Sequence, residues 1–168
     1  MKINWKFALN ITGVGLLLIL GVIIVLPNFL NQPSIARQNV GKTFAGSMNR
    51  AQEVFFKENN RLATFGERRK LLGFEPAGYQ TGNYLLKSVY QPNLQSVMNI
   101  GQAKRKGFKS YVGLVYVVKV GEEYITIKKM CESIKDLPLS KLPQIPQLPE
   151  NAATSEDINC PSGFESWG

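Results

Sequence analysis

The chain has 168 residues, a formal net charge of +8 and no histidine. Without histidine it lacks the commonest general base and the commonest metal ligand, so histidine-dependent catalytic and metal sites are excluded. The basic excess is compatible with nucleic acid, anionic lipid or an acidic partner, and it says nothing about the fold. Beyond an apolar N-terminal stretch about 130 residues remain, which is enough for one ordinary domain.

The first predicted element is a transmembrane helix over residues 7–30, preceded by a basic cytoplasmic leader at residues 1–6. No charged residue lies between Lys6 and Arg37, and about 20 apolar residues suffice to cross a bilayer. Trp5 is placed like an interfacial aromatic residue, and the N-terminal lysines favour a cytoplasmic N-terminus. The residues singled out in this membrane and assembly helix are Ile11, Gly13, Leu17, Gly21, Ile24 and Pro27.

Two other interpretations of this stretch remain open. A cleaved secretory signal would need small residues three and one positions before the cut, and no such pair follows Leu26. A buried helix of a soluble protein is disfavoured by the length of the apolar run. We therefore expect a single-pass membrane protein whose remaining chain is periplasmic, lumenal or extracellular.

The second predicted element is an amphipathic helix over residues 34–60, which we expect to pack on a sheet rather than to bind a cofactor. Its apolar stripe at helical period consists of Ile35, Phe44, Met48, Ala51 and Phe55. Thr64 and Glu67 resemble a capping box, which predicts a short helix through Leu72 that ends at Gly73.

From residue 84 onward the pattern changes to that of β-strands. Four segments rich in Val, Ile, Tyr and Leu predict an antiparallel sheet of four strands: Tyr84–Tyr90, Leu94–Ile100, Tyr111–Val120 and Tyr124–Cys131. Gly121, Glu122 and Glu123 separate the last two segments and indicate a hairpin. The predicted fold class is therefore α+β, with the amphipathic helix packed on the sheet in a globular part at residues 31–135.

Residues 136–168 contain five prolines and few large apolar residues, which predicts a loop and tail rather than a core. Cys131 and Cys160 are the two cysteines of the chain. In an exported domain they favour one disulfide over a redox pair, and two thiols alone do not make a zinc site. Closing a loop of about thirty residues would stabilise the domain by roughly 3 kcal/mol.

No catalytic set, cofactor-binding loop or metal-ligand cluster is found, so the sequence does not indicate an enzyme. Two basic clusters are candidate sites. They are Lys104, Arg105, Lys106 and Lys109 in a predicted loop, and Arg68, Arg69 and Lys70 in the predicted short helix. Each can be an ordinary solvated surface or a contact for lipid headgroups, a partner or DNA. Nucleic acid is disfavoured, because no aromatic stacking platform accompanies the charges.

Separated motifs resemble those of one protein family. The motifs are Leu26 to Gln32, Gly46 to Phe56, Lys109 to Gly113, and Met130 to Glu132. The first looks like the end of the hydrophobic half of a type IV pilin helix. The others are similar to the second half of that helix and to the sheet in cyanobacterial type IV pilin-like proteins of the G/H family. The likeness covers roughly residues 20–131, and the loop between the two cysteines fits the disulfide-bounded region of pilins.

The resemblance implies one long N-terminal helix whose second half lies on an antiparallel sheet. It implies a non-enzymatic, minor or atypical subunit of a pilus-like or secretion assembly, without a cofactor. Its partners would be membrane lipid and other pilin-like or membrane-complex subunits. One departure stands out, since a prepilin has a glycine before its cleavage point and a glutamate shortly after it. Counted back from Pro27, those positions hold Trp5 and Asn10. An uncleaved accessory subunit of another membrane complex, for example a photosynthetic one, is therefore the alternative.

Overall fold

A computed structural model describes residues 38–64, 66–67, 79–93, 95–136 and 138–167. They belong to the second of two compact units, Gln38–Gly168. The predicted membrane helix with its six assembly residues, Ile35, and residues 68–73 of the predicted short helix with its three basic residues lie outside the described residues. Within the part of the chain that is described, no helix is long and apolar enough to cross a membrane.

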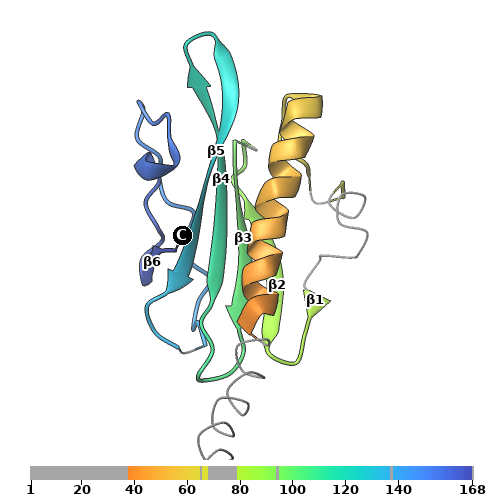
Figure 1. The fold of residues 1–168 in the computed structure, drawn as a ribbon, viewed down its shortest axis with the longest axis vertical. Coiled ribbons are helices and arrows are strands. Elements are labelled where there is room, and N and C mark those ends of the chain that lie inside the picture. Colours follow the sequence, from red (N-terminus) through yellow and green to blue (C-terminus); the bar gives the residue numbers. More distant parts are fainter. Residues whose placement is uncertain (1–37, 65, 68–78, 94, 137, 168) are drawn as a thin grey trace, which may run out of the picture. The chain divides into compact units, whose positions relative to one another are not determined.

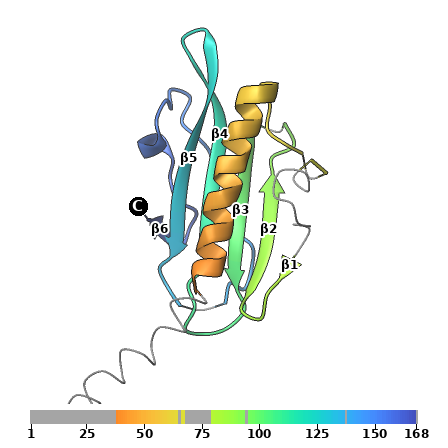
Figure 2. The same cartoon turned by 45° about the vertical axis from the view of Figure 1, so that its right-hand side comes forward.

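The helix occupies residues 38–59 and lies along one face of the sheet (Figures 1 and 2). Its buried face consists of Gly41, Phe44, Ala45, Met48, Asn49, Gln52 and Phe56. The predicted stripe was therefore right at Phe44 and Met48. It was wrong at Ala51 and Phe55, which are only half-buried. The helix ends at Asn60, whose φ of 54° lies in the left-handed region that asparagine tolerates.

Six strands form one sheet in the order β1-β2-β3-β4-β5-β6, and every neighbouring pair is antiparallel. The strands are β1 (Tyr79–Gln80), β2 (Tyr84–Tyr90), β3 (Ser96–Ala103), β4 (Tyr111–Val120), β5 (Glu123–Ser133) and β6 (Phe164–Ser166). The predicted bounds of β2 and β4 are confirmed. The second predicted strand, Leu94–Ile100, was placed too early, because β3 begins at Ser96 and continues to Ala103. The hairpin between β4 and β5 is confirmed, with Gly121 at a φ of 64°.

The predicted number of four strands was wrong. Five strands have three or more residues, and the two-residue β1 adds a sixth. β6 was missed because three residues are too few for a recognisable alternation, and because its pairing depends on a distant bond. Cys160 is bonded to Cys131, and Cys131 in turn pairs with Ser166 of β6. The predicted disulfide is therefore present, and it holds the chain end beside the last residues of β5.

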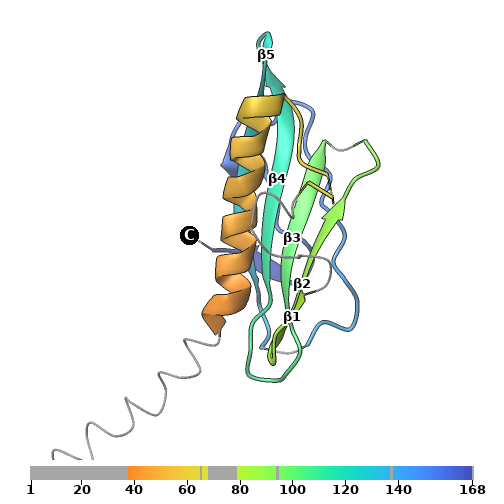
Figure 3. The same ribbon diagram turned by 90° about the vertical axis from the view of Figure 1, so that its right-hand side faces the viewer.

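The sheet is buried on both faces. Along β4, Tyr111 and Val115 belong to clusters with helix residues, whereas Leu114 and Tyr116 belong to a separate cluster. This alternation is the two-residue period expected of a strand whose two faces are both covered. The helix covers one face, as Figure 3 shows from the side.

The C-terminal segment covers the other face. Ala152, Ile158 and Phe164 are buried in the cluster that contains Leu114, and Leu139, Ile145 and Leu148 pack against it. The prediction of a loop without core residues was therefore wrong for this segment, although its described residues are irregular apart from the three-residue helical turn Ser155–Asp157 and β6. Single apolar residues separated by prolines have no periodicity that would predict their burial.

Tyr116 ties the segment to the sheet. Its hydroxyl donates a hydrogen bond of 2.8 Å to the carbonyl oxygen of Pro146. Burial raises the pKa of Tyr116 to about 12, because the charged phenolate would be poorly solvated there.

Replacing Tyr116 by phenylalanine is expected to lower the free energy of unfolding by about 1 kcal/mol, the net contribution of one buried hydrogen bond. The ring packing is retained, so the fold should not change. Denaturant titration of the full chain in detergent measures the difference. A loss above about 3 kcal/mol would mean that the hydroxyl does more than bond one carbonyl.

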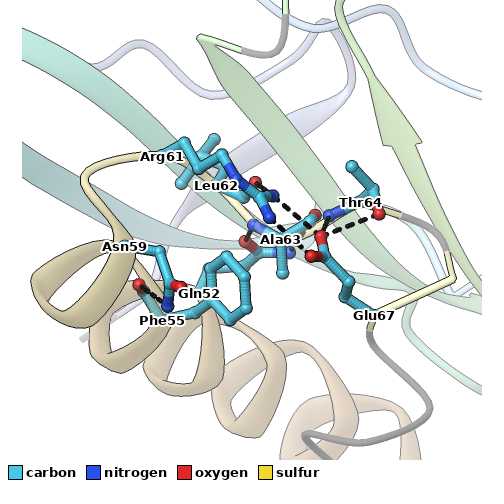
Figure 4. Close-up of polar contacts among 8 residues, drawn as sticks. All are labelled: Gln52, Phe55, Asn59, Arg61, Leu62, Ala63, Thr64 and Glu67. Carbon is cyan, nitrogen blue, oxygen red and sulfur yellow. Dashed lines mark hydrogen bonds and ion pairs between the residues drawn. The ribbon is translucent and has the colours of Figure 1, made fainter.

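The chain that leaves the helix is held back against it, as Figure 4 shows. The side chain of Gln52 accepts a hydrogen bond from the Ala63 amide at 2.9 Å and donates to the Ala63 carbonyl at 3.3 Å. Glu67 accepts from the Thr64 amide at 2.9 Å, so this part of the predicted capping box is confirmed. Arg61 donates two hydrogen bonds to Glu67, at 2.5 and 2.8 Å. These bonds hold the pKa of Glu67 well below its usual range.

Candidate interaction surface

The predicted basic loop is only partly an open cationic surface. Lys104, Arg105 and Lys106 are exposed in the connection between β3 and β4. Lys109 is different, since its ammonium lies 2.7 Å from a carboxylate oxygen of Glu132 and 3.6 Å from one of Glu165. The hydrogen bond to Glu132 raises the pKa of Lys109. Lys109, two residues before β4, is thus paired with carboxylates of β5 and β6. Lys104, Arg105 and Lys106 remain exposed in the loop, where the Lys104 ammonium donates to the Thr81 carbonyl oxygen at 3.4 Å.

A groove that the sequence did not reveal lies between the helix, β5 and the chain end. It encloses about 840 Å³. We call it the helix–β5 groove. Its cationic and hydroxyl-bearing lining residues are Lys42, Arg50, Lys128, Lys129, Thr43, Ser47, Ser155 and Ser166. Among the described residues, Glu156 is the one carboxylate that lines it. Ammonium, guanidinium and hydroxyl groups are donors, so this lining suits an anionic, oxygen-rich partner.

Two of the groove's cations are held in place by neighbours. The ammonium of Lys42 lies 3.6 Å from the ring centroid of Trp167, within cation–π range. Lys128 forms an ion pair with Glu53, which also lies 3.2 Å from Lys57. The hydrogen bond from Lys128 lowers the pKa of Glu53. A distant chain end, a helix and a strand therefore contribute to one surface, and no sequence period predicts that combination.

The floor of the groove is fixed by buried amides. Asn49 is 2% exposed, and its side-chain nitrogen donates to the Leu114 carbonyl at 3.2 Å. Its oxygen accepts a bond of 2.9 Å from the amide nitrogen of Asn99, whose oxygen in turn accepts one of 2.5 Å from Ser88. A satisfied buried network of this kind specifies one arrangement of helix and sheet, and so fixes the helix side of the groove.

Replacing Glu53 by glutamine should make the free energy of unfolding depend less on pH in the acid range. A carboxyl whose pKa is lower in the folded than in the unfolded state binds fewer protons when folded. Its contribution to the free energy of unfolding is therefore fully present above its ordinary pKa. That contribution is lost as the pH falls through the lowered pKa. Because the pair is partly exposed, we expect a difference below about 1 kcal/mol. Thermal unfolding from pH 6 to pH 3 measures it, and an equal decline in both proteins would contradict it.

Two further features of the surface concern partners. The turn between β4 and β5 carries exposed Glu122 and Glu123, and Val120 and Tyr124 beside them are 42% and 60% exposed. The outer face of the helix exposes Val40 and Val54, at 39% and 52%. These two valines lie close to four helical turns apart, and so on the same face. Among the described residues, no group of three or more histidine, cysteine, aspartate or glutamate side chains could hold a metal ion.

Comparison with known proteins identifies one family. Residues 38–161 match the model of the type IV pilin-like G and H family. No curated protein and no solved structure matches the chain. The matched residues begin with the first described residue of the helix and end just after Cys160, so they contain the helix, strands β1 to β5 and the disulfide.

Proposed function

Because the chain belongs to the type IV pilin-like G and H family, we propose that it is a membrane-anchored structural subunit of a cyanobacterial pilus-like or secretion assembly. Within that assembly it is a minor or atypical component. The family is structural and non-enzymatic. The observation that carries the proposal is the family match over residues 38–161, on a fold in which one long helix lies against an antiparallel sheet.

The proposed anchor is the apolar stretch at residues 7–30, with the N-terminus in the cytoplasm. The globular domain then lies in the periplasm, a lumen or outside the cell. The bond between Cys131 and Cys160 supports this placement, because disulfides persist in oxidising compartments.

The outer face of the helix supports contact with other subunits. Val40 and Val54 are exposed on it, and the small residues Thr43 and Ser47 between them also line the helix–β5 groove, so this face and the groove adjoin. A helix of another pilin-like subunit can pack closely against such a face. Membrane lipid and other pilin-like subunits are therefore the proposed partners.

Deletion of the chain tests this proposal. We expect fewer surface filaments per cell by electron microscopy, and reduced motility or secretion, with recovery when the intact chain is restored. Unchanged filaments and unchanged motility and secretion would contradict it.

A second candidate function is that of an uncleaved single-pass accessory subunit in another membrane complex, for example a photosynthetic one. Trp5 and Asn10 favour it, since they occupy the positions where a prepilin has a glycine and a glutamate. Affinity purification of the tagged chain from membranes separates the two functions. Recovery with pilus machinery supports the first, and recovery with another complex alone supports the second.

A further inference from the structure

We propose that the acidic turn between β4 and β5 of one copy docks in the helix–β5 groove of a second copy. This inference rests on the proposed assembly function and names a contact by which copies would meet. The turn, which we call the acidic tip, consists of residues 120–124. The groove is the one lined by Lys42, Arg50, Lys128 and Lys129.

The acidic tip has the form of a docking element. In Figures 1 and 3 the β4–β5 hairpin extends beyond the end of the helix. Glu122 and Glu123 are exposed at its turn. Val120 and Tyr124 flank them with exposed apolar surface, and the ammonium of Lys119 lies 6.0 Å from the Tyr124 ring centroid. A narrow projection with carboxylates at its end and apolar flanks is suited to insertion into a cationic hollow.

The groove has the complementary chemistry. Lys128 is already paired with Glu53, so Lys42, Arg50 and Lys129 face the carboxylate Glu156 among the described lining residues. Its wall also includes Met130 and Trp167, which offer apolar contact to the flanks of an inserted tip. Opposite charges placed across an interface steer association and fix its register.

A second copy fits this groove better than an unrelated acidic segment, because the chain itself carries the matching element. The other adjacent acidic pair in the described residues is Glu156 and Asp157. Asp157 is committed locally, since it accepts hydrogen bonds from the amides of Ala153 and Thr154 at 2.9 and 2.8 Å. Glu156 already lines the groove. The tip is therefore the paired carboxylate element that remains available to a neighbour.

The positions of tip and groove mean that the contact requires a second copy. Both involve β5, but Glu122 and Lys129 are separated by seven residues of extended chain, roughly 23 Å at the rise of a strand. A copy thus cannot fill its own groove. Two different patches meet in such a contact, so it is either reciprocal within a pair of copies or repeated head to tail into a ring or an open row.

Site-specific crosslinking of the full chain in detergent tests the contact. One population carries Val120→Cys in the tip, a second carries Ser47→Cys in the groove, and the two are mixed under mild oxidation. We expect a crosslinked dimer that forms only in the mixture. Intact mass and melting curves verify that each variant keeps the Cys131–Cys160 bond and folds.

Charge reversal shows whether the crosslink depends on the proposed pairing. Glu122→Lys with Glu123→Lys on the tip copy, or Lys42→Glu with Arg50→Glu on the groove copy, should each lower the crosslink yield about tenfold. Reversing both copies together should restore most of it. The matched control, Lys104→Glu with Lys106→Glu in the β3–β4 loop, should leave the yield unchanged.

The proposal is overturned if the mixture gives no specific crosslink, if the paired reversal gives no recovery, or if the loop control has the same effect. A groove that binds another acidic protein but not the tip also overturns it. The proposed function fails separately, through unchanged filaments, motility and secretion after deletion. A chain that is needed for filaments but does not crosslink would leave the function standing and remove this contact.

Discussion

A chain without its disulfide, made by C131A/C160A, is expected to lose about 3–4 kcal/mol of unfolding free energy. The bond closes a loop with a sequence separation of 29 residues, and the chain-entropy model assigns a loop of about thirty residues that much restriction of the unfolded state. The loss is a large part of the 5–15 kcal/mol typical of a domain. Denaturant titration of the full chain in detergent measures it.

The position of the bond gives this variant a second, local signature. The bonded loop contains Ala152 and Ile158, which are buried on the sheet face opposite the helix, and β6 follows it directly. Trp167, beside β6, reports on this region in a Trp5→Phe background. We expect its fluorescence to change at lower denaturant than the circular dichroism of the whole domain. The prediction is contradicted if fluorescence and circular dichroism change together in the variant and at the same denaturant concentration as in the disulfide-bonded protein.

Replacing Gly101 by alanine is expected to cost about 3 kcal/mol, at the upper end for overpacking, or to prevent folding. A Cβ atom at Gly101 would lie 2.5 Å from the Cα atom and 2.6 Å from the carbonyl oxygen of Gly41. Both are backbone atoms of the helix, so no side-chain rotation can relieve the clash. The helix would have to move off the sheet, away from the Asn49–Asn99 hydrogen bond.

Gly46→Ala is the matched control for this substitution. Nothing lies within 4 Å of a Cβ atom at Gly46, and alanine is the better helix former by about 0.5–1 kcal/mol. Opposite signs are therefore expected for the two alanines in the same titration. If the two substitutions changed the free energy of unfolding equally, the helix would not lie as close to β3 as the structure shows.

Most of the central sheet was predictable because its signals are local. β2 and β4 have the strand bounds that the pattern indicates, and Gly121 marks the hairpin between β4 and β5. The disulfide was predictable for a different reason, since Cys131 and Cys160 are the only cysteines of the chain. These features depend on residue type and spacing alone.

The parts that were missed depend on contacts between distant residues. Gln52 is polar, yet it is fully buried because the returning chain supplies the Ala63 amide and carbonyl as partners. Phe164 is buried through the tethered chain end. The helix–β5 groove likewise combines Lys42, Lys128 and Trp167 from three separate segments. The spacing of apolar residues along the sequence carries no information about these long-range contacts.

The basic loop shows the same limit for charges. Lys104 and Lys109 look equivalent in the sequence, but Lys109 alone lies within 4 Å of both Glu132 and Glu165. Its partners come from β5 and β6, more than twenty residues away, so spacing could not reveal that its charge is already compensated.

The most direct test of the account is to determine whether the chain is present in filaments sheared from intact cells. Filaments are pelleted, washed and analysed by intact-mass spectrometry, with the membrane fraction as the comparison. We expect the chain in the filament pellet with the Cys131–Cys160 bond intact. A chain that is found in membranes but is absent from that pellet would contradict its role as a pilin-like subunit of a filament.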